Sequence, residues 1–174
     1  ISPAEFLPVV EEIGLMDQIG SWVLVTACKE AMKWPGDLVV AVNAAPSELE
    51  KPGFADRVRD ALKISRLPGS RLEIEITEGA ILNQSPIVMA TLLQLRQLGV
   101  KIAIDDFGTG YASLSQLSQF PFDKIKLDRS LAGFDGNNLK KRAIVRAVTS
   151  LGQSLGMSVL GEGVETLEQM EWLK

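Results

Sequence analysis

The sequence predicts a parallel α/β fold that forms a single domain, and one observation supports each part of this prediction. Short runs rich in β-branched residues alternate with longer helical stretches, in the rhythm strand, helix, strand, helix, over five strands. This rhythm is typical of a parallel sheet covered by helices. No low-complexity segment or run of charge divides the 174 residues, so we expect a single domain over 1–174.

Local signals place the individual elements. Ser2-Pro3-Ala4-Glu5 joins an N-cap serine, an early proline and a glutamate three residues after the cap, which predicts a helix reaching about Ile13. A second helix, over 16–34, should stop at Pro35-Gly36. Periodicity and glycine or proline stops predict further helices at 54–65, 87–98, 113–118, 142–155 and 166–174. The predicted strands are 38–42, 72–77, 101–105, 124–127 and 158–160.

Within the predicted helix 142–155, one face is apolar. Its members are Ile144, Val148, Leu151 and Leu155.

Polar residues lie on or at the end of each predicted strand. They are Asn43, Glu75, Asp105 with Asp106, Lys126, and Glu162. Their spacings of 32, 30, 21 and 36 residues are close to the roughly 31 residues per unit of a (β/α)₈ barrel, taken from ~250 residues over eight units. In such a barrel the carboxyl ends of the strands meet at one mouth, where the chemistry occurs. We therefore expect these side chains to converge.

Composition limits the function classes. The net charge is −4 and the pI is about 5.0, which argues against nucleic-acid binding. No run is long enough to span a membrane, and the first residues lack a signal-peptide pattern. Cys28 is the single cysteine, so it has no internal disulfide partner and a cytoplasmic location is expected.

The chain contains no histidine. Ser-His and Cys-His mechanisms are thereby excluded, as are His-rich zinc sites. Converging carboxylates repel one another unless cations lie between them, and oxygen ligands favour Mg²⁺ or Mn²⁺. Because Asp105 and Asp106 are adjacent, they could reach two different ions, which is the arrangement used in two-metal phosphodiester hydrolysis.

Five motifs stand at these positions, in order along the chain. They are Val42-Asn43-Ala44-Ala45-Pro46, Glu73-Ile74-Glu75-Ile76-Thr77-Glu78, Asp105-Asp106-Phe107-Gly108-Thr109-Gly110-Tyr111, Lys126-Leu127-Asp128 and Glu162-Gly163-Val164-Glu165-Thr166. Together they resemble the motifs of EAL-type cyclic-di-GMP phosphodiesterase domains, in that family's order and spacing. The resemblance covers essentially the whole chain.

The resemblance implies a modified TIM (β/α)₈ barrel that hydrolyses cyclic di-GMP to linear pGpG with two Mg²⁺ or Mn²⁺ ions. It implies that Asn43, Glu75, Asp105 and Asp106 bind metal, with Asp105 bridging the ions. Lys126 is then expected to orient the attacking water or the phosphate. For Glu162, two roles stay open, general base or ligand of the second ion.

The resemblance also implies a role for the loop after Asp106. Glu78 and Glu165 are expected to support this loop, which includes Phe107, Gly108, Thr109 and Gly110. In the family the loop links the metal site to a dimer interface, so a homodimer is expected. The full protein could also carry a sensor or GGDEF-type domain.

The chain departs from the family pattern at both ends. It lacks the Glu-Ala-Leu motif, whose glutamate is a metal ligand, and it stops before the last strand. We therefore expect an internal portion of the domain with about five parallel strands, inactive as an isolated chain.

Each motif also has a simpler explanation. Asp105-Asp106 could form an ordinary turn, and Asn43 could be a turn residue before Pro46. Glu73 and Glu75 share a strand face that could simply be solvated. Lys126 could be a surface lysine, and Glu165 a favourable charge at a helix start. An alternative function is a catalytically silent EAL module that binds cyclic di-GMP or a protein partner as a regulator. Because Glu75, Asp105, Asp106 and Glu162 are all present, descent from an active enzyme is favoured.

Overall fold

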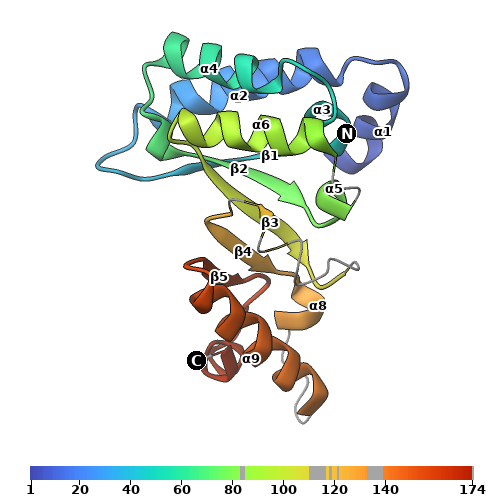
Figure 1. The fold of residues 1–174 in the computed structure, drawn as a ribbon, viewed down its shortest axis with the longest axis vertical. Helices are drawn as coiled ribbons and strands as arrows, with labels where there is room; N and C mark the ends of the chain where they lie inside the picture. The colour runs from blue at the N-terminus through green and yellow to red at the C-terminus, as the bar shows by residue number, and fades with distance from the viewer. Residues whose placement is uncertain (83–84, 110–116, 118, 121, 133–138, 174) are drawn as a thin grey trace. The chain divides into compact units, whose positions relative to one another are not determined.

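The predicted alternation of strands and helices is confirmed in a computed structural model, which describes residues 1–174 except 83–84, 110–116, 118, 121, 133–138 and 174. Five strands occur in the sheet order β1-β2-β3-β4-β5, the order of the chain (Figure 1). The chain divides into two units, residues 1–74 with 85–101 and residues 75–84 with 102–174.

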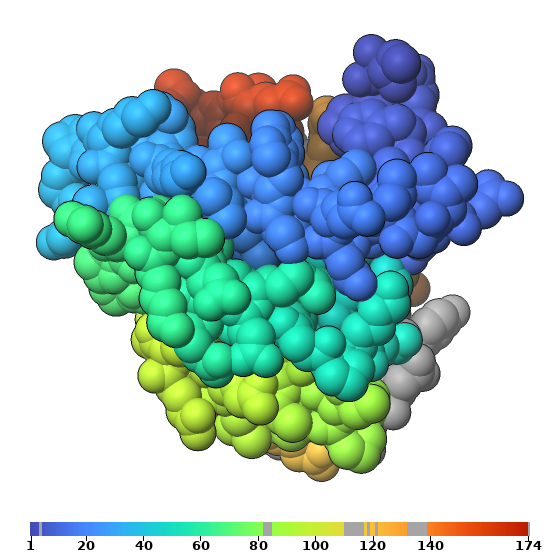
Figure 2. All heavy atoms as spheres, turned by 90° about the horizontal axis from the view of Figure 1, so that it is seen from above, coloured from blue at the N-terminus to red at the C-terminus, as the bar shows by residue number. Residues whose placement is uncertain are grey.

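The first unit contains one complete strand and most of the helices that precede β3. Its elements are α1 (Pro3–Glu12), α2 (Met16–Ala31), β1 (Val40–Ala44), α3 (Pro46–Leu49), α4 (Phe54–Ser65), the 3₁₀ turn η1 (Gly69–Arg71) and α6 (Pro86–Gln97). Helix α4 packs against both α2 and α6, and the three helices form successive bands in Figure 2. Cys28 of α2 is fully buried in this layer, as a packing residue.

Strand β1 begins two residues later than predicted. The carbonyl of Leu38 accepts a hydrogen bond from Arg71 Nε at 2.9 Å, and Arg71 Nη2 donates to the carbonyl of Ala31 at 2.8 Å. The Leu38 carbonyl, just before the strand, therefore accepts its hydrogen bond from the Arg71 side chain. Strand β1 also extends two residues beyond its predicted end, so Asn43 lies within the strand.

The predicted end of the second helix was also wrong. Helix α2 ends at Ala31, because Lys33 and Trp34 donate their N–H groups three residues back, to Glu30 and Ala31, in a turn. The short helices α3, α5 (Gly79–Leu82) and α8 (Arg129–Ala132) were not predicted. One or two turns give too few residues to show helical periodicity.

The second unit contains the end of β2 (Leu72–Thr77) and nearly all of β3 (Lys101–Phe107). It continues with β4 (Lys124–Leu127), α9 (Leu139–Ser154), β5 (Ser158–Gly161) and α10 (Leu167–Leu173), in addition to α5 and α8. Strand β4 pairs with β3 and β5 in parallel, with Ile125 opposite Ile104 and Val159. The helix predicted at 113–118 lies outside the described residues apart from Leu117.

The predicted apolar face of α9 was partly wrong. Val148 is buried, but Ile144 and Leu155 are exposed; Val145 and Gly152 are buried instead. A Cβ atom added to Gly152 would lie 2.5 Å from Val159 Cγ2. Helix α9 therefore turns its glycine toward β5, and this close approach sets the rotation of the helix.

In the part of the chain that the structure describes, no helix has both the length and the apolar character needed to cross a membrane.

Candidate active site

Three carboxylates surround the ammonium group of Lys126 in the second unit. Lys126 Nζ is 2.8 Å from Glu75 Oε2, 3.0 Å from Asp105 Oδ1 and 2.8 Å from Glu162 Oε1. These residues come from β2, β3, β4 and the residue after β5. The N–H of Glu162 donates to the Leu127 carbonyl at 3.0 Å, which continues the β4–β5 ladder to the site. The parallel strands thus bring together four side chains that are distant in sequence.

The charge balance of this cluster favours a bound cation. Burial acts to lower the pKa of Lys126, but the hydrogen bonds to Glu162, Glu75 and Asp105 outweigh it, so its pKa lies above the ordinary value. Lys126 therefore stays charged. One ammonium group cannot neutralise Glu75, Asp105 and Glu162 together, and the site keeps an excess of negative charge.

Asp106 adds a fourth carboxylate through an unusual backbone conformation. Its φ angle is +53°, in the left-handed region that aspartate tolerates better than most residues. Its N–H donates to Asp105 Oδ1 at 3.0 Å. This turn breaks the strand alternation, and carboxylate oxygens of Asp105, Asp106 and Glu162 lie within 4.8 Å of one another.

The surroundings of Asp106 disfavour its charged form. Desolvation raises the pKa of the Asp106 carboxyl, and the negative charges of Asp105, Asp128 and Glu162 raise it further, while Lys126 acts in the opposite direction. Carboxylates crowded in this way are typical of a site whose cation would relieve their repulsion.

The donor set fits a hard divalent ion. The three clustered side chains offer carboxylate oxygens, the ligands that Mg²⁺ and Mn²⁺ prefer. Asp105 and Glu162 are only partly exposed, and Asp106 is exposed, so an ion could enter from solvent. Exposed acidic groups alone do not define a metal site; here the additional observation is the buried Glu75–Lys126 pair beside them.

Glu78, which is 3% exposed, holds the first residues of the loop after β3. Glu78 Oε2 accepts the N–H of Gly108 at 3.0 Å, and the N–H of Glu78 donates to the Asp105 carbonyl at 3.2 Å. Thr109 Oγ1 donates to the Asp106 carbonyl at 2.9 Å. One buried carboxylate therefore connects the start of the loop to the strand that carries Asp105.

Gly108 cannot easily be replaced in this loop. Its φ angle is +101°, and a Cβ atom there would lie 1.9 Å from Leu131 Cδ1. The neighbouring Phe107 is buried. Gly110, the last predicted loop residue, lies outside the described residues.

Glu165 contacts the loop region less directly. It forms an ion pair with Arg129 of α8 at 3.4 Å, and both side chains are largely exposed, so the pair contributes little stability. Gly163 has a φ of +66°, and a Cβ atom there would lie 2.8 Å from Arg129 Cγ. The structure therefore pairs Glu165 with Arg129 of α8.

Two residues of the site were not assigned a role from sequence. The carboxylate of Asp128 accepts the N–H of Ser130 at 2.8 Å at the start of α8, and this hydrogen bonding lowers the pKa of Asp128. The Asp-x-Ser pattern is a recognisable signal for such a turn. Arg129 could not be paired with Glu165 from sequence, because the partners are far apart in the chain.

Asn43 lies in the other unit. It is exposed on β1, on the face opposite the buried Val42 and Ala44. Because successive side chains of a strand point to opposite faces, Asn43 faces away from the helices that cover Val42 and Ala44.

Comparison with known proteins gives a consistent result. The profile of the EAL domain family matches residues 1–174. The bifunctional diguanylate cyclase/cyclic di-GMP phosphodiesterase MucR of Pseudomonas aeruginosa is 39% identical over 177 residues, which cover 99% of this chain and 26% of MucR. The chain spans about a quarter or less of the length of the curated relatives it matches first.

Solved structures show the same similarity. The PaMucR phosphodiesterase in complex with c-di-GMP superposes with a TM-score of 0.93 at 40% identity, over 99% of this chain and 77% of that one. The manganese/cy-diGMP complex of Klebsiella pneumoniae BlrP1 superposes with a TM-score of 0.88 at 34% identity, over 99% of this chain and 44% of that one.

Proposed function

Because this chain belongs to the EAL domain family, we propose that it forms the metal-binding part of a phosphodiesterase that hydrolyses cyclic di-GMP to linear pGpG. The observation that carries the proposal is the cluster of Asp105, Asp106 and Glu162, with ligand oxygens within 4.8 Å of one another. EAL domains have a modified TIM barrel fold, and this chain has five parallel strands of that kind. The manganese in the BlrP1 complex supports a divalent ion as the cofactor.

We propose two kinds of role for these residues: some would bind the metal ions, and others would orient the attacking water and the substrate phosphate. Asp105, Asp106 and Glu75 would hold Mg²⁺ or Mn²⁺, which would supply positive charge to offset charge that develops on the phosphodiester. For Asn43, a role as metal ligand is implied by the family resemblance alone. Lys126, kept protonated by its carboxylate neighbours, is suited to orient the attacking water or a phosphate oxygen. Water positioned near Lys126 would also lie near Glu162, because the two side chains are 2.8 Å apart.

The role of Glu162 follows from its exposure. Its side chain is 34% exposed, against 10% for Glu75 and 15% for Asp105. A more exposed carboxylate is easier to reach for water and can pass a proton to solvent. We therefore assign Glu162 as the proton acceptor that faces the nucleophile, with service as a metal ligand as the alternative.

The proposed partner of the chain is a second copy of itself. The N–H of Gly108, at the start of the loop after Asp106, is held by Glu78, and the family resemblance implies that this loop adjoins an interface with a second copy of the chain. The greater length of the relatives, one of them named as a bifunctional diguanylate cyclase, favours further sensor or GGDEF-type domains in the full protein. The buried lone Cys28 is compatible with a cytoplasmic location.

The function is tested by incubating the protein that contains these residues with cyclic di-GMP and identifying the product by chromatography. We expect linear pGpG in Mn²⁺ or Mg²⁺ and none after chelation with EDTA, with recovery on adding the ion back. Tight binding of cyclic di-GMP without hydrolysis in either ion would indicate the silent regulatory module instead. Light scattering of the same sample measures whether the active species is a dimer.

A further inference from the structure

The short helix α8 begins where strand β4 of the candidate site ends (Figure 1). The N–H of Asp128, the residue between β4 and α8, donates to the carbonyl of Phe107 at 3.3 Å. On the other side of β4, the carbonyl of Leu127 accepts the N–H of Glu162 at 3.0 Å. The Leu131 N–H donates to the Asp128 carbonyl at 2.9 Å. Helix α8 therefore starts from backbone that is hydrogen-bonded at the ends of both β3 and β5.

One side chain of α8 packs against the loop after β3. A Cβ atom at Gly108 would lie 1.9 Å from Leu131 Cδ1 and 2.9 Å from Leu131 Cγ, so the half-buried Leu131 fills the space beside this glycine. Gly108 stands two residues after Asp106, and its N–H donates to Glu78 Oε2 at 3.0 Å. Gly108 is thus held by a hydrogen bond to Glu78 and by contact with Leu131.

A second side chain of α8 packs against the segment after β5. A Cβ atom at Gly163 would lie 2.8 Å from Arg129 Cγ, 3.0 Å from Cδ and 3.1 Å from Cβ, so the aliphatic stem of Arg129 lies against the backbone next to Glu162. The guanidinium is 3.4 Å from Glu165, and the two side chains are 71% and 64% exposed. Because an ion pair this exposed adds little stability, we attribute the restraint on this segment to the stem of Arg129.

The two contacts are close in sequence to two carboxylates of the cluster. Asp106 precedes Gly108 by two residues and Glu162 directly precedes Gly163, and carboxylate oxygens of Asp106 and Glu162 lie within 4.8 Å of each other. Their negative charges repel, which acts to move the two segments apart. Since neither glycine has a side chain, this movement is opposed by the side chains that α8 places against them.

We propose that Leu131 and Arg129 are positioning residues, which hold Asp106 and Glu162 at the spacing that the bound cation and the attacking water require. The inference rests on the proposed function. Groups at a metal site must be placed to within about 0.5 Å, and partners that orient a metal ligand change affinity or activity roughly 10–100-fold. Leu131 carries no atom that binds a cation, so its effect on cation affinity must act through the loop.

For Leu131, the test is Mn²⁺ affinity, measured by calorimetry on the full protein that contains these residues. Leu131→Ala should raise the dissociation constant about tenfold, and the Gly108 amide should exchange faster in EDTA because its hydrogen bond opens more often. Leu131→Met, which keeps most of the side-chain volume, should restore both values. The matched control is Leu155→Ala, at a leucine of the same unit that is 39% exposed, which should change neither value.

For Arg129, two substitutions separate the packing of the stem from the charge. Arg129→Met keeps atoms that can lie against Gly163 but removes the pair with Glu165, whereas Arg129→Ala removes both. At saturating Mn²⁺ we expect Arg129→Ala to lower the turnover number about tenfold, because Glu162 moves, and Arg129→Met to stay within about twofold of wild type. Equal losses in both variants would assign the effect to the charge and overturn the positioning role of Arg129. The control for net charge is Arg146→Ala, at an exposed position of α9.

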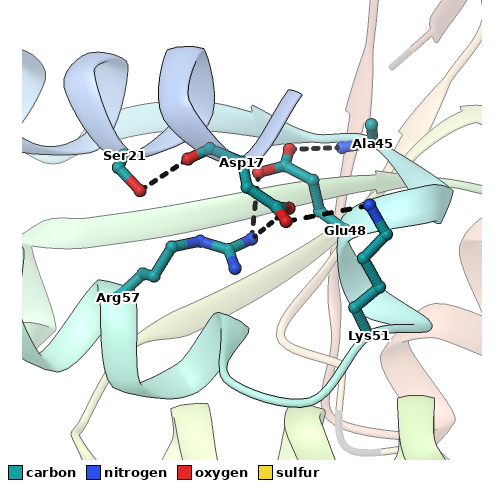
Figure 3. Close-up of polar contacts among 6 residues, drawn as sticks. All are labelled: Asp17, Ser21, Ala45, Glu48, Lys51 and Arg57. Carbon is teal, nitrogen blue, oxygen red and sulfur yellow. Dashed lines mark hydrogen bonds and ion pairs between the residues drawn. The ribbon is translucent and has the colours of Figure 1, made fainter. Parts of the chain in front are cut away.

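A variant in the first unit separates positioning from a general loss of stability. Arg57 Nη2 is 3.2 Å from Glu48 Oε1 and 3.3 Å from Asp17 Oδ1, in a cluster that joins three helices (Figure 3). Because Glu48 is 3% exposed, Arg57→Met leaves a buried carboxylate without its partner and should lower the unfolding midpoint in EDTA. This cluster belongs to the other unit, so the Mn²⁺ affinity of the folded variant should stay at the wild-type value.

The outcomes distinguish the two proposals. If the wild-type protein binds no Mn²⁺, the proposed function fails and the positioning role fails with it. If it binds Mn²⁺ without turnover, the function fails and the Leu131 variants alone decide the positioning role.

If the wild type binds Mn²⁺ and turns over, wild-type affinity in Leu131→Ala overturns the role of Leu131, and wild-type turnover in Arg129→Ala overturns that of Arg129. A loss of affinity in Arg57→Met equal to that in Leu131→Ala overturns the role of Leu131 too, because destabilisation alone then explains it. Should Leu131→Ala not fold, the two Arg129 variants decide, since that side chain is 71% exposed.

Discussion

Replacing Asp105 with asparagine is expected to abolish hydrolysis of cyclic di-GMP while leaving the fold intact. The change keeps the size of the side chain and its ability to accept the Asp106 N–H, but removes a negative charge that both Lys126 and a cation would contact. The loss of turnover should exceed the roughly 10–100-fold typical of groups that only orient a metal ligand. The measurement is the turnover number at saturating Mn²⁺ and substrate.

Asp60→Asn is the matched control for this variant. Asp60 is an exposed residue of α4, in the other unit, and the change alters net charge by the same amount. We expect wild-type turnover from the control and a circular dichroism spectrum like that of the wild type from both variants. Turnover within a few-fold of wild type in Asp105→Asn would exclude Asp105 as a ligand of the catalytic ion.

Replacing Lys126 with methionine is expected to destabilise the metal-free protein and to abolish activity. The variant leaves Glu75, Asp105 and Glu162 without the ammonium that lies 2.8–3.0 Å from each of them. Removing one partner of a buried ion pair costs about 3–5 kcal/mol; because Glu162 is 34% exposed, we expect about 3 kcal/mol. Chemical denaturation in EDTA measures this loss.

Mn²⁺ should restore much of the stability lost in Lys126→Met, but not its activity. The added ion can neutralise the crowded carboxylates, whereas nothing replaces the ammonium that orients the water or phosphate. Lys63→Met, at an exposed position of α4, is the control and should change neither property. The role given to Lys126 would be contradicted by a Lys126→Met variant with wild-type turnover, or by one with the wild-type free energy of unfolding in EDTA.

The fold could be predicted where periodicity and stop signals coincide. Strands β2 and β4 and helix α4 have the predicted bounds, and Ser2 and Glu5 form the predicted helix start, with the Ser2 N–H 3.2 Å from Glu5 Oε2. Each of these elements depends on neighbours in sequence. Their boundaries are therefore visible without knowledge of the packing.

Contacts between residues distant in sequence explain why the start of β1 and the buried face of α9 were predicted wrongly. Strand β1 starts late because the Arg71 side chain bonds to Leu38, and α9 rotates because Gly152 approaches Val159. The apolar residues of α9 fit two faces almost equally well, one through Ile144 and one through Val145. Only the packing against β5 distinguishes them.

In the candidate site, too, some features follow a pattern in the sequence and others depend on packing. The spacing of strand-end residues predicted that Glu75, Asp105, Lys126 and Glu162 would meet, and the structure brings them together. The positive φ of Asp106, which brings its carboxylate near Asp105 and Glu162, has no clear signal in the sequence. Neither does the Asp17–Arg57–Glu48 cluster, whose members come from three different helices. The functional roles of the site residues remain predictions.

Anomalous X-ray diffraction from crystals of the protein grown with Mn²⁺ and cyclic di-GMP tests the central claim most directly. The account predicts manganese peaks bound by carboxylate oxygens of Asp105 and Asp106, with the Glu162 carboxylate, which lies within 4.8 Å of theirs, facing the water and the substrate phosphate beside the ions. Well-occupied manganese elsewhere, with Asp105 and Glu162 still paired to Lys126 and no ion at Asp105 and Asp106, would contradict it.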